Sequence, residues 1–267
     1  MEIGMSTASF FGLYHTEDAL KQIGDMGLSL CEVFLDSYTE YDEAFAHTLN
    51  DIACSYGLRV HSVHAMGTQF EPQLFSVNKR QKKDAFHVLG RVMQAAKILG
   101  AQCFVFHGPL NLKRSFYRRN YETFCAQIDE ITSFCQDYGI KLAWENVHWC
   151  AYSAPGFAEK LRKRCRTDNL YYTLDLKQAA FSGYSIEEYI EDMDGDIVNL
   201  HICDFRISGG EVRPLLPGAG ECDWEAVGAA LDRQGYAGPA IIEVYQDSRH
   251  GLAELSRSVE WVKGVLG

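Results

Sequence analysis

The chain has 267 residues, of which 47% are hydrophobic and 23% are charged. This balance supports a large packed core and excludes a disordered, collagen-like or small disulfide-stapled protein. The formal net charge of −11 argues against a nucleic-acid-binding surface, which needs clustered lysine and arginine. No stretch approaches the roughly 20 apolar residues of a membrane span, so no membrane partner is expected.

The beginning of the chain and its cysteines both point to a reducing compartment. The first five residues lack the basic flank and apolar run of a signal peptide. The nine cysteines include no C-x-x-C pair, so neither a zinc ribbon nor a redox dithiol is predicted. Several of them lie inside apolar runs, where a reduced cysteine packs as a small hydrophobe. The sequence therefore predicts a cytoplasmic protein.

One pattern recurs along the chain: a helical stretch ends at a glycine, and a short apolar run follows within a few residues. Glycine just past a helix supplies the left-handed conformation that ends it. Near-continuous apolar runs are typical of parallel strands that are covered on both faces. The clearest amphipathic stretches are residues 79–99 and 120–138. Eight strands are predicted in chain order, at about residues 2–6, 29–35, 58–64, 102–107, 140–146, 170–175, 196–202 and 239–244.

Each predicted strand is followed by a helical segment, and the last of these covers about residues 251–265. Strict alternation over eight units predicts an α/β protein with a closed (β/α)8 TIM barrel, formed as a single domain over residues 1–267. An open doubly wound sheet is the alternative. Such a sheet would usually carry a glycine-rich phosphate loop after its first strand, and no such motif follows residues 2–6.

Six consecutive predicted strands end in histidine, glutamate or aspartate. These residues are His64, His107, Glu145, Asp175, His201 and Glu243. In a parallel barrel all strand C-termini lie on one face, where active sites are assembled from different strands. Imidazoles and carboxylates that converge there form a ligand set suited to Zn, Mn, Co or Mg. A single histidine or glutamate at a strand end is more often structural, but six in succession predict a divalent metal centre.

With these motifs the chain resembles the xylose isomerase-like TIM barrels. That superfamily includes sugar and sugar-phosphate isomerases and epimerases, related proteins of inositol catabolism and the endonuclease IV branch. The resemblance covers nearly the whole chain. Its markers are His64 and the segments FVFHGP, LAWENV, LYYTLD, NLHICD, LLPGAGECDW and IIEVY.

The resemblance implies the roles of the strand-end residues. A metal, with one ion expected, would be held by Glu145, Asp175, His201 and Glu243. In isomerases and epimerases of this type the two glutamates also act as acid and base on opposite faces of the sugar. His64 and His107 would contact the substrate or support the ligands. In the endonuclease branch these two histidines would instead bind a second metal together with Glu145.

At two places the sequence differs from the family pattern, and both differences limit the chemistry that the site is expected to perform. Many members carry histidine three residues after the strand-6 aspartate, where this chain has Gln178. Glutamine can bind a hydroxyl group but cannot transfer a proton. The endonuclease branch has Asp-x-His where this chain has Val212-Arg213-Pro214, so a trinuclear cluster is not expected.

Other residues near the predicted site have weaker signals. Gln178, Arg206 and Trp149 are expected to contact substrate, although Arg206 could equally be a solvated loop residue and Trp149 part of core or lid packing. A basic cluster after the fourth strand could attract a phosphorylated sugar, but an exposed first helical turn explains it better; its members are Lys113, Arg114, Arg118 and Arg119. Lys177 adjoins the site in sequence and is given no role.

The residues and the resemblance together predict a divalent-metal-dependent isomerase or epimerase. Its substrate would be a small ketose or an inositol-derived keto-sugar, converted through a cis-enediolate with Glu145 and Glu243 as acid and base. Three alternatives remain open: a dehydratase of the inositol-pathway type, an endonuclease IV-like phosphodiesterase, and a non-catalytic sugar-binding barrel. The expected partner is a small sugar, and homo-oligomer formation is left open.

Overall fold

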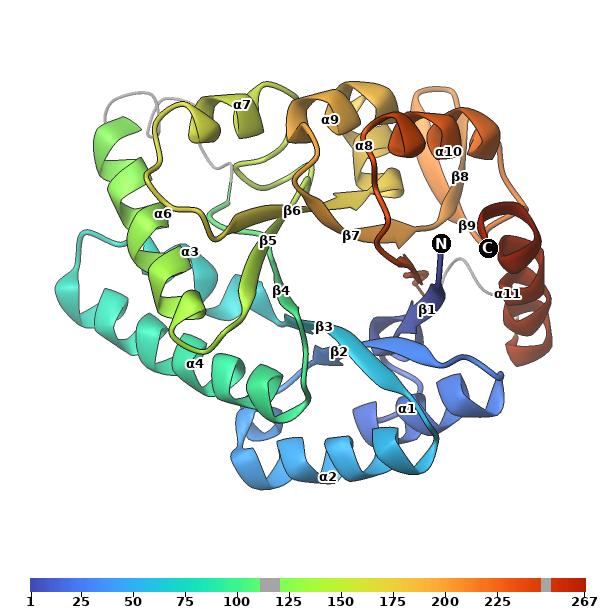
Figure 1. Ribbon diagram of the computed structural model, residues 1–267, viewed down its shortest axis with the longest axis horizontal. Coiled ribbons are helices and arrows are strands. Elements are labelled where there is room, and N and C mark those ends of the chain that lie inside the picture. Colours follow the sequence, from blue (N-terminus) through green and yellow to red (C-terminus); the bar gives the residue numbers. More distant parts are fainter. Residues whose placement is uncertain (111–120, 246–250) are drawn as a thin grey trace.

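A computed structural model describes residues 1–110, 121–245 and 251–267 of the chain. Parallel strands close into a barrel in the spatial order β1-β10-β7-β6-β5-β4-β3-β2, and helices surround it (Figure 1). The predicted (β/α)8 TIM barrel is therefore confirmed. The barrel strands are β1 (Ile3–Ser6), β2 (Leu30–Leu35), β3 (Arg59–Ala65), β4 (Cys103–Phe106), β5 (Lys141–Glu145), β6 (Leu170–Asp175), β7 (Ile197–Ile202) and β10 (Ala240–Ile242).

Helices lie between successive strands along the chain. The longer ones are α1 (Thr16–Asp25), α2 (Glu43–Ser55), α4 (Lys79–Ile98), α6 (Tyr121–Gln136), α7 (Phe157–Arg162), α8 (Leu176–Ser182), α9 (Ile186–Met193), α10 (Trp224–Arg233) and α11 (Leu252–Leu266). The short ones are α3 (Glu71–Leu74) and the 3-10 turns η1 (Thr7–Phe10), η2 (Tyr38–Tyr41) and η3 (Gly67–Gln69). Among the helices described, none is both long enough and apolar enough to cross a membrane.

The helix-to-strand connections follow from the sequence pattern. Helix α4 buries Ala85, Leu89, Val92 and Ala96, which are spaced three and four residues apart and so form one apolar face. The chain then turns into β4 through Gly100, whose φ of 69° lies in the left-handed region that favours glycine. Positive φ recurs at the other glycines predicted to end helices, namely Gly27, Gly57, Gly139 and Gly235. Their predicted role is confirmed.

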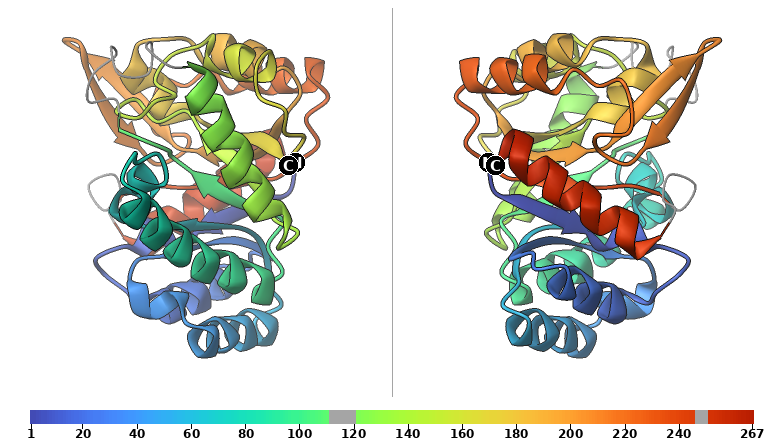
Figure 2. Two further views of the ribbon diagram at one scale, coloured as in Figure 1. Left: turned by 90° about the vertical axis from the view of Figure 1, so that its left-hand side faces the viewer. Right: turned by 90° about the vertical axis from the view of Figure 1, so that its right-hand side faces the viewer.

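The barrel closes where its first and last strands pair. Ile3 lies beside Ala240, and Met5 lies beside Ile242, in parallel register. The two ends of the chain meet nearby, because the Met1 ammonium donates a hydrogen bond of 2.7 Å to the carbonyl oxygen of Leu266 (Figures 1 and 2). Closure removes the sheet edges and places the C-terminal ends of all eight strands on one face of the barrel.

An antiparallel hairpin follows β7 and is not among the predicted elements. Its strands are β8 (Asp204–Ser208) and β9 (Glu211–Leu215), and it projects from the barrel (Figure 2). The turn is Gly209-Gly210, and both glycines have positive φ, as the tightest hairpin turns require. A Gly-Gly pair between two short runs is thus the sequence signal for this hairpin.

Asp204 fastens the base of the hairpin to the loop that follows it. Its buried carboxylate accepts hydrogen bonds of 2.8–3.3 Å from the backbone N–H groups of Phe205, Gly218 and Cys222 and from the indole N–H of Trp224. The LLPGAGECDW segment therefore folds around one buried carboxylate, which satisfies backbone donors that no strand partner reaches.

Removing this carboxylate should destabilise the protein. Asp204→Ala is expected to lower the free energy of unfolding by about 3–5 kcal/mol, because several buried donors lose a charged acceptor together. Urea denaturation measures the change. Asp51→Ala, on the exposed face of α2, is the control and should change the free energy by less than about 0.5 kcal/mol. If both variants unfold at the same urea concentration, Asp204 does not hold this loop.

Candidate functional site

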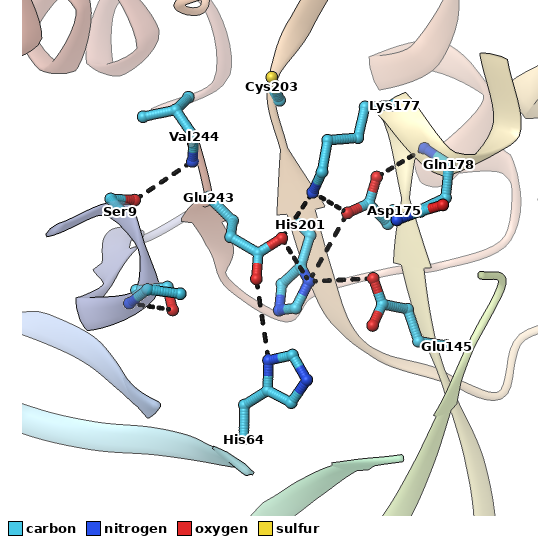
Figure 3. A network of polar contacts seen from close by, with 12 residues as sticks. Ser9, His64, Glu145, Asp175, Lys177, Gln178, His201, Cys203, Glu243 and Val244 are labelled. Atoms are coloured by element: carbon cyan, nitrogen blue, oxygen red, sulfur yellow. Dashed lines mark hydrogen bonds and ion pairs between the residues drawn. The ribbon is translucent and has the colours of Figure 1, made fainter. Parts of the chain in front are cut away.

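The six residues predicted at the strand ends converge at the mouth of the barrel, and Figure 3 shows all of them except His107. Four of them form one compact group: Glu145, Asp175, His201 and Glu243 each offer a ligand atom, these atoms lie within 4.8 Å of one another, and all four residues are buried. Two further groups that could hold an ion overlap with it, one formed by His64, His107 and Glu145 and one by Glu32, His64 and Glu243. The barrel thus assembles a buried cluster of carboxylates and imidazoles.

His201 lies at the centre of this cluster. Its Nδ1 atom lies 3.5 Å from Oε1 of Glu145, 3.9 Å from Oδ2 of Asp175 and 3.7 Å from Oε2 of Glu243 (Figure 3). These separations exceed ordinary hydrogen-bond lengths and suit atoms that share one ion. Although burial alone would lower it, the surrounding carboxylates raise the pKa of His201 well above its ordinary value. The cluster therefore attracts positive charge.

Glu32 on β2 sets the orientation of His201. Its Oε2 atom accepts a hydrogen bond of 2.9 Å from Nε2 of His201 and one of 2.6 Å from the hydroxyl of Ser62. Although burial alone would raise it, contact with His201 lowers the pKa of Glu32 to about 2. A histidine that donates through Nε2 presents Nδ1 to the cluster, as metal-ligating histidines usually do. Sequence reasoning missed Glu32, although a glutamate inside the apolar run LSLCEVFL is itself a signal, because a buried charge needs a partner.

Asp175 divides its two carboxylate oxygens between the helix and the site. Oδ1 accepts the backbone N–H of Gln178 at 2.8 Å and so caps α8, which leaves Oδ2 facing the cluster. The side-chain amide of Asn146 fixes the backbone at this point, because it donates to the carbonyl oxygen of Asp175 at 3.0 Å and accepts its N–H at 2.7 Å. Asn146 directly follows Glu145, so two ligands from neighbouring strands are held together.

The last strand is fastened in a similar way. The hydroxyl of Ser9 in η1 donates to the carbonyl oxygen of Ile242 at 3.2 Å. It also accepts the N–H of Val244 at 3.2 Å (Figure 3). Glu243 lies between these two residues, and its own N–H donates to Ile202 at 3.1 Å. Its carboxylate is thereby aimed into the barrel mouth.

His64 and His107 lie between the two glutamates. Nε2 of His107 is 2.8 Å from Oε2 of Glu145 and 3.0 Å from Nε2 of His64, while Nδ1 of His64 is 3.8 Å from Oε1 of Glu243. Burial and the adjacent His107 lower the pKa of His64 to about 4. Burial opposes charge on His107 as well, but the carboxylate of Glu145 outweighs it and raises the pKa of His107.

The turn after β4 holds His107 rigidly. A carboxylate oxygen of Glu71 accepts the backbone N–H groups of His107 and Gly108 at 2.9 and 2.8 Å, and the indole of Trp144 donates to the carbonyl oxygen of His107 at 3.1 Å. Gly108 has a φ of 74°, and a Cβ atom there would lie 2.4 Å from the Trp144 ring. Only glycine therefore fits the FVFHGP turn beside His107.

Lys177 is part of the site, which corrects the sequence interpretation that gave it no role. Its Nζ atom is buried between Oδ2 of Asp175 and Oε2 of Glu243, at 2.5 Å from each (Figure 3). Although burial alone would lower it, these two carboxylates raise the pKa of Lys177 well above its ordinary value. The sequence carried only a weak signal, since the contact with Glu243 spans 66 residues.

The remaining predicted substrate contacts lie in different surroundings. The side-chain oxygen of Gln178 is 2.6 Å from Nδ1 of His148 rather than in the cluster. Arg206, on β8, is half-exposed and donates to Glu221 at 3.1 Å. Trp149 is partly exposed, and its ring meets that of His107 edge-on at 5.7 Å between centroids. The basic cluster at Lys113, Arg114, Arg118 and Arg119 lies outside the described residues.

The donor set fits a divalent cation. Carboxylate oxygens and an imidazole nitrogen are the ligands that Zn, Mn and Co prefer, and the oxygens also suit Mg. In the described part of the chain, Nδ1 of His201 is buried and has no hydrogen-bond partner, although three carboxylates of the cluster face it. Buried polar atoms rarely remain unpartnered unless an ion or a ligand satisfies them. Glu145, Asp175, His201 and Glu243 are therefore the residues that would hold such an ion.

Fold and site together define a class: a TIM barrel whose strand ends carry a buried cluster of carboxylates and imidazoles. The family model described as "Xylose isomerase-like TIM barrel" matches residues 20–265. The chain belongs to this family. The resemblance stated from the sequence motifs is thus confirmed.

Proteins of known sequence or structure match over the full length of the chain. An uncharacterized protein of Mycobacterium leprae is 26% identical over 291 residues, which cover 100% of this chain and 98% of that protein. The crystal structure of a D-tagatose 3-epimerase-like protein has a TM-score of 0.82 at 20% identity, covering 100% of this chain and 97% of that one. A structure of the IOLI protein with a bound zinc atom has a TM-score of 0.81 at 16% identity, covering 100% and 98%. The structural matches, at these identities, show a shared fold.

The orienting role of Glu32 can be tested by metal binding. Glu32→Gln keeps the size of the side chain but removes the charge that holds Nε2 of His201. We expect it to weaken Zn²⁺ binding by about 10–100-fold, as for other partners of metal-ligating histidines. Competition with a chelating dye measures the affinity. Glu225→Gln, on the exposed side of α10, should leave it unchanged; equal affinities in all three proteins would contradict the role of Glu32.

Proposed function

We propose that the protein is a divalent-metal-dependent isomerase or epimerase of a small ketose or an inositol-derived keto-sugar. One observation carries the proposal: two buried glutamates, Glu145 and Glu243, share one compact ligand cluster with Asp175 and His201 at the mouth of the barrel. Asp175 and His201 would hold one ion together with the glutamates. The glutamates would also transfer the proton.

When bound, a divalent ion supplies the polarisation of the substrate carbonyl and the charge stabilisation that make the adjacent C–H bond acidic. One glutamate carboxylate then removes that proton to give a cis-enediolate, and the other returns a proton to the opposite face. Oε1 of Glu145 and Oε2 of Glu243 lie on either side of Nδ1 of His201 in Figure 3. This placement supports transfer at two faces of a substrate held between them.

Neighbouring side chains would complete the sugar site. His107 lies beside Oε2 of Glu145, and His64 lies beside Oε1 of Glu243. From these positions the two histidines would bind substrate hydroxyls or hold the carboxylates in position. The exposed ring of Trp149 next to His107 offers an apolar face for a sugar ring or chain. Gln178 and Arg206 would serve as further contacts only after leaving His148 and Glu221.

Structures with the same fold support this assignment. One similar structure is that of a D-tagatose 3-epimerase-like protein, and another, that of the IOLI protein, contains zinc. The endonuclease alternative lacks support, because Val212-Arg213-Pro214 lies in the projecting β8–β9 hairpin and carries no metal ligands. The net charge of −11 likewise gives no reason to propose a nucleic-acid partner.

Metal content is the first test of the proposal. The purified protein is expected to bind one equivalent of a divalent ion among Zn, Mn, Co and Mg, lost on treatment with a chelator. Elemental analysis and anomalous scattering measure the number and position of the ions. A protein that takes up none of these four ions at excess, or one with three well-occupied sites, would contradict the proposed centre.

The second test separates an enzyme from a sugar-binding barrel. Glu145→Gln and Glu243→Gln each keep the size and one oxygen ligand but remove the carboxylate base. Each change is expected to lower turnover of the preferred ketose by about 10²–10⁴-fold at saturating metal. A panel of ketoses in D₂O identifies the substrate, because an epimerase incorporates deuterium beside the carbonyl.

Glu225→Gln is the matched control for this test and should turn over at the parent rate. A dehydratase would release the hydroxyl as water and give a dehydrated product, so product analysis distinguishes it. If both glutamate variants, fully loaded with metal, epimerise as fast as the parent, the two-glutamate mechanism is wrong.

A further inference from the structure

Lys177 is the part of the site that the proposed mechanism leaves unused. Its side chain is 1% exposed, and its ammonium donates hydrogen bonds of 2.5 Å to Oδ2 of Asp175 and Oε2 of Glu243. In the portion of the chain that the structure describes, no other lysine or arginine forms an ion pair with the four-residue ligand set. Lys177 is therefore the one permanent cation in direct contact with the ligands there.

The ammonium and a metal ion would compete for the same atoms. Oδ2 of Asp175 and Oε2 of Glu243, which hold the ammonium, are the oxygens that face Nδ1 of His201 at 3.9 and 3.7 Å. An ion at the usual distance of about 2.1 Å from either oxygen would lie within about 4.6 Å of Nζ. Two cations that close in a buried site repel each other strongly, because little water screens them.

The Lys177 ammonium has two favourable places nearby, one between the carboxylates of the ligand cluster and one against the ring of Tyr245. Without an ion, the buried carboxylates of Glu145, Asp175 and Glu243 would repel one another, and the ammonium relieves part of this repulsion. The same ammonium lies 4.9 Å from the centroid of the Tyr245 ring, whose face can hold it by a cation–π contact. Tyr245 is 43% exposed, so an ammonium that moves toward its ring leaves the ligand cluster in the direction of the solvent.

We propose that Lys177 is a built-in counter-ion of the metal site: its ammonium holds Asp175 and Glu243 together in the metal-free protein and is displaced toward Tyr245 when a divalent ion binds. Lys177 thereby weakens metal binding and keeps the empty site folded. This inference rests on the metal site of the proposed function but not on its chemistry.

The test compares metal affinity with stability in the metal-free state. Lys177→Met and Lys177→Gln remove the charge with different polarity, and Lys163→Met, at an exposed position on the end of α7, is the control. All proteins are stripped with a chelator and titrated with Zn²⁺ and with Mn²⁺ alone. Both Lys177 variants are expected to bind each ion at least about 10-fold more tightly than the parent, while the control matches the parent.

Thermal unfolding gives a second readout that needs no substrate. The metal-free Lys177 variants should melt below the metal-free parent, and saturating Zn²⁺ should remove or reverse this difference, because the ion then replaces the ammonium. A variant that folds only with metal present also supports the proposal. A variant that folds neither with nor without metal contradicts it, because an ion then cannot replace Lys177.

Equal or weaker metal binding by the folded Lys177 variants would overturn the inference and leave the metal site of the proposed function intact. If neither the parent nor the variants bind any ion, the metal site itself fails and the inference fails with it. If only the variants bind, no ion displaces the ammonium in the parent, and this result overturns the inference together with the proposed metal centre.

Discussion

Closure of the parallel sheet is the constraint on which the site depends. Each ligand comes from a different strand, and the pairing of β1 with β10 bends the sheet until the ends of β5, β6, β7 and β10 surround one axis. An open sheet would spread the same residues along an edge. The barrel interior below the mouth is filled with buried side chains, so the carboxylates at its rim interact in a medium that screens them poorly. Closure of the barrel therefore determines both the geometry of the cluster and the strength of its electrostatic interactions.

A group of buried carboxylates is unfavourable for folding by itself. Glu32, Glu145, Asp175 and Glu243 are all at most 1% exposed, and each would be more stable in water. Such an arrangement persists where function requires it and where neighbouring cations offset the repulsion. In this protein His201 and Lys177 are within reach of these groups, so the site is a compromise between stability and the capacity to take up further positive charge.

Hydrogen bonds to the backbone at the strand ends hold the charged side chains of the site in one geometry. Asn146, Glu71 and Ser9 each bond to main-chain groups at or beside a ligand-bearing position, and none of them belongs to the ligand set. A site whose ligands are fixed before binding loses less conformational entropy when an ion or substrate arrives. The scaffold therefore explains why polar side chains outside the ligand set lie beside the ligand-bearing strand ends at the mouth of the barrel.

The sequence by itself determined the barrel and the strand-end residues, because these depend on local signals: apolar runs, helical periodicity and glycines that end helices. In a barrel whose strands follow chain order, the topology adds little further uncertainty. The contacts of the side chains were decided by tertiary structure alone. Glu32 meets His201 across 169 residues, and Lys177 meets Glu243 across 66. No local pattern encodes such pairs, because they arise only when closure brings distant strands together and packing selects the rotamers.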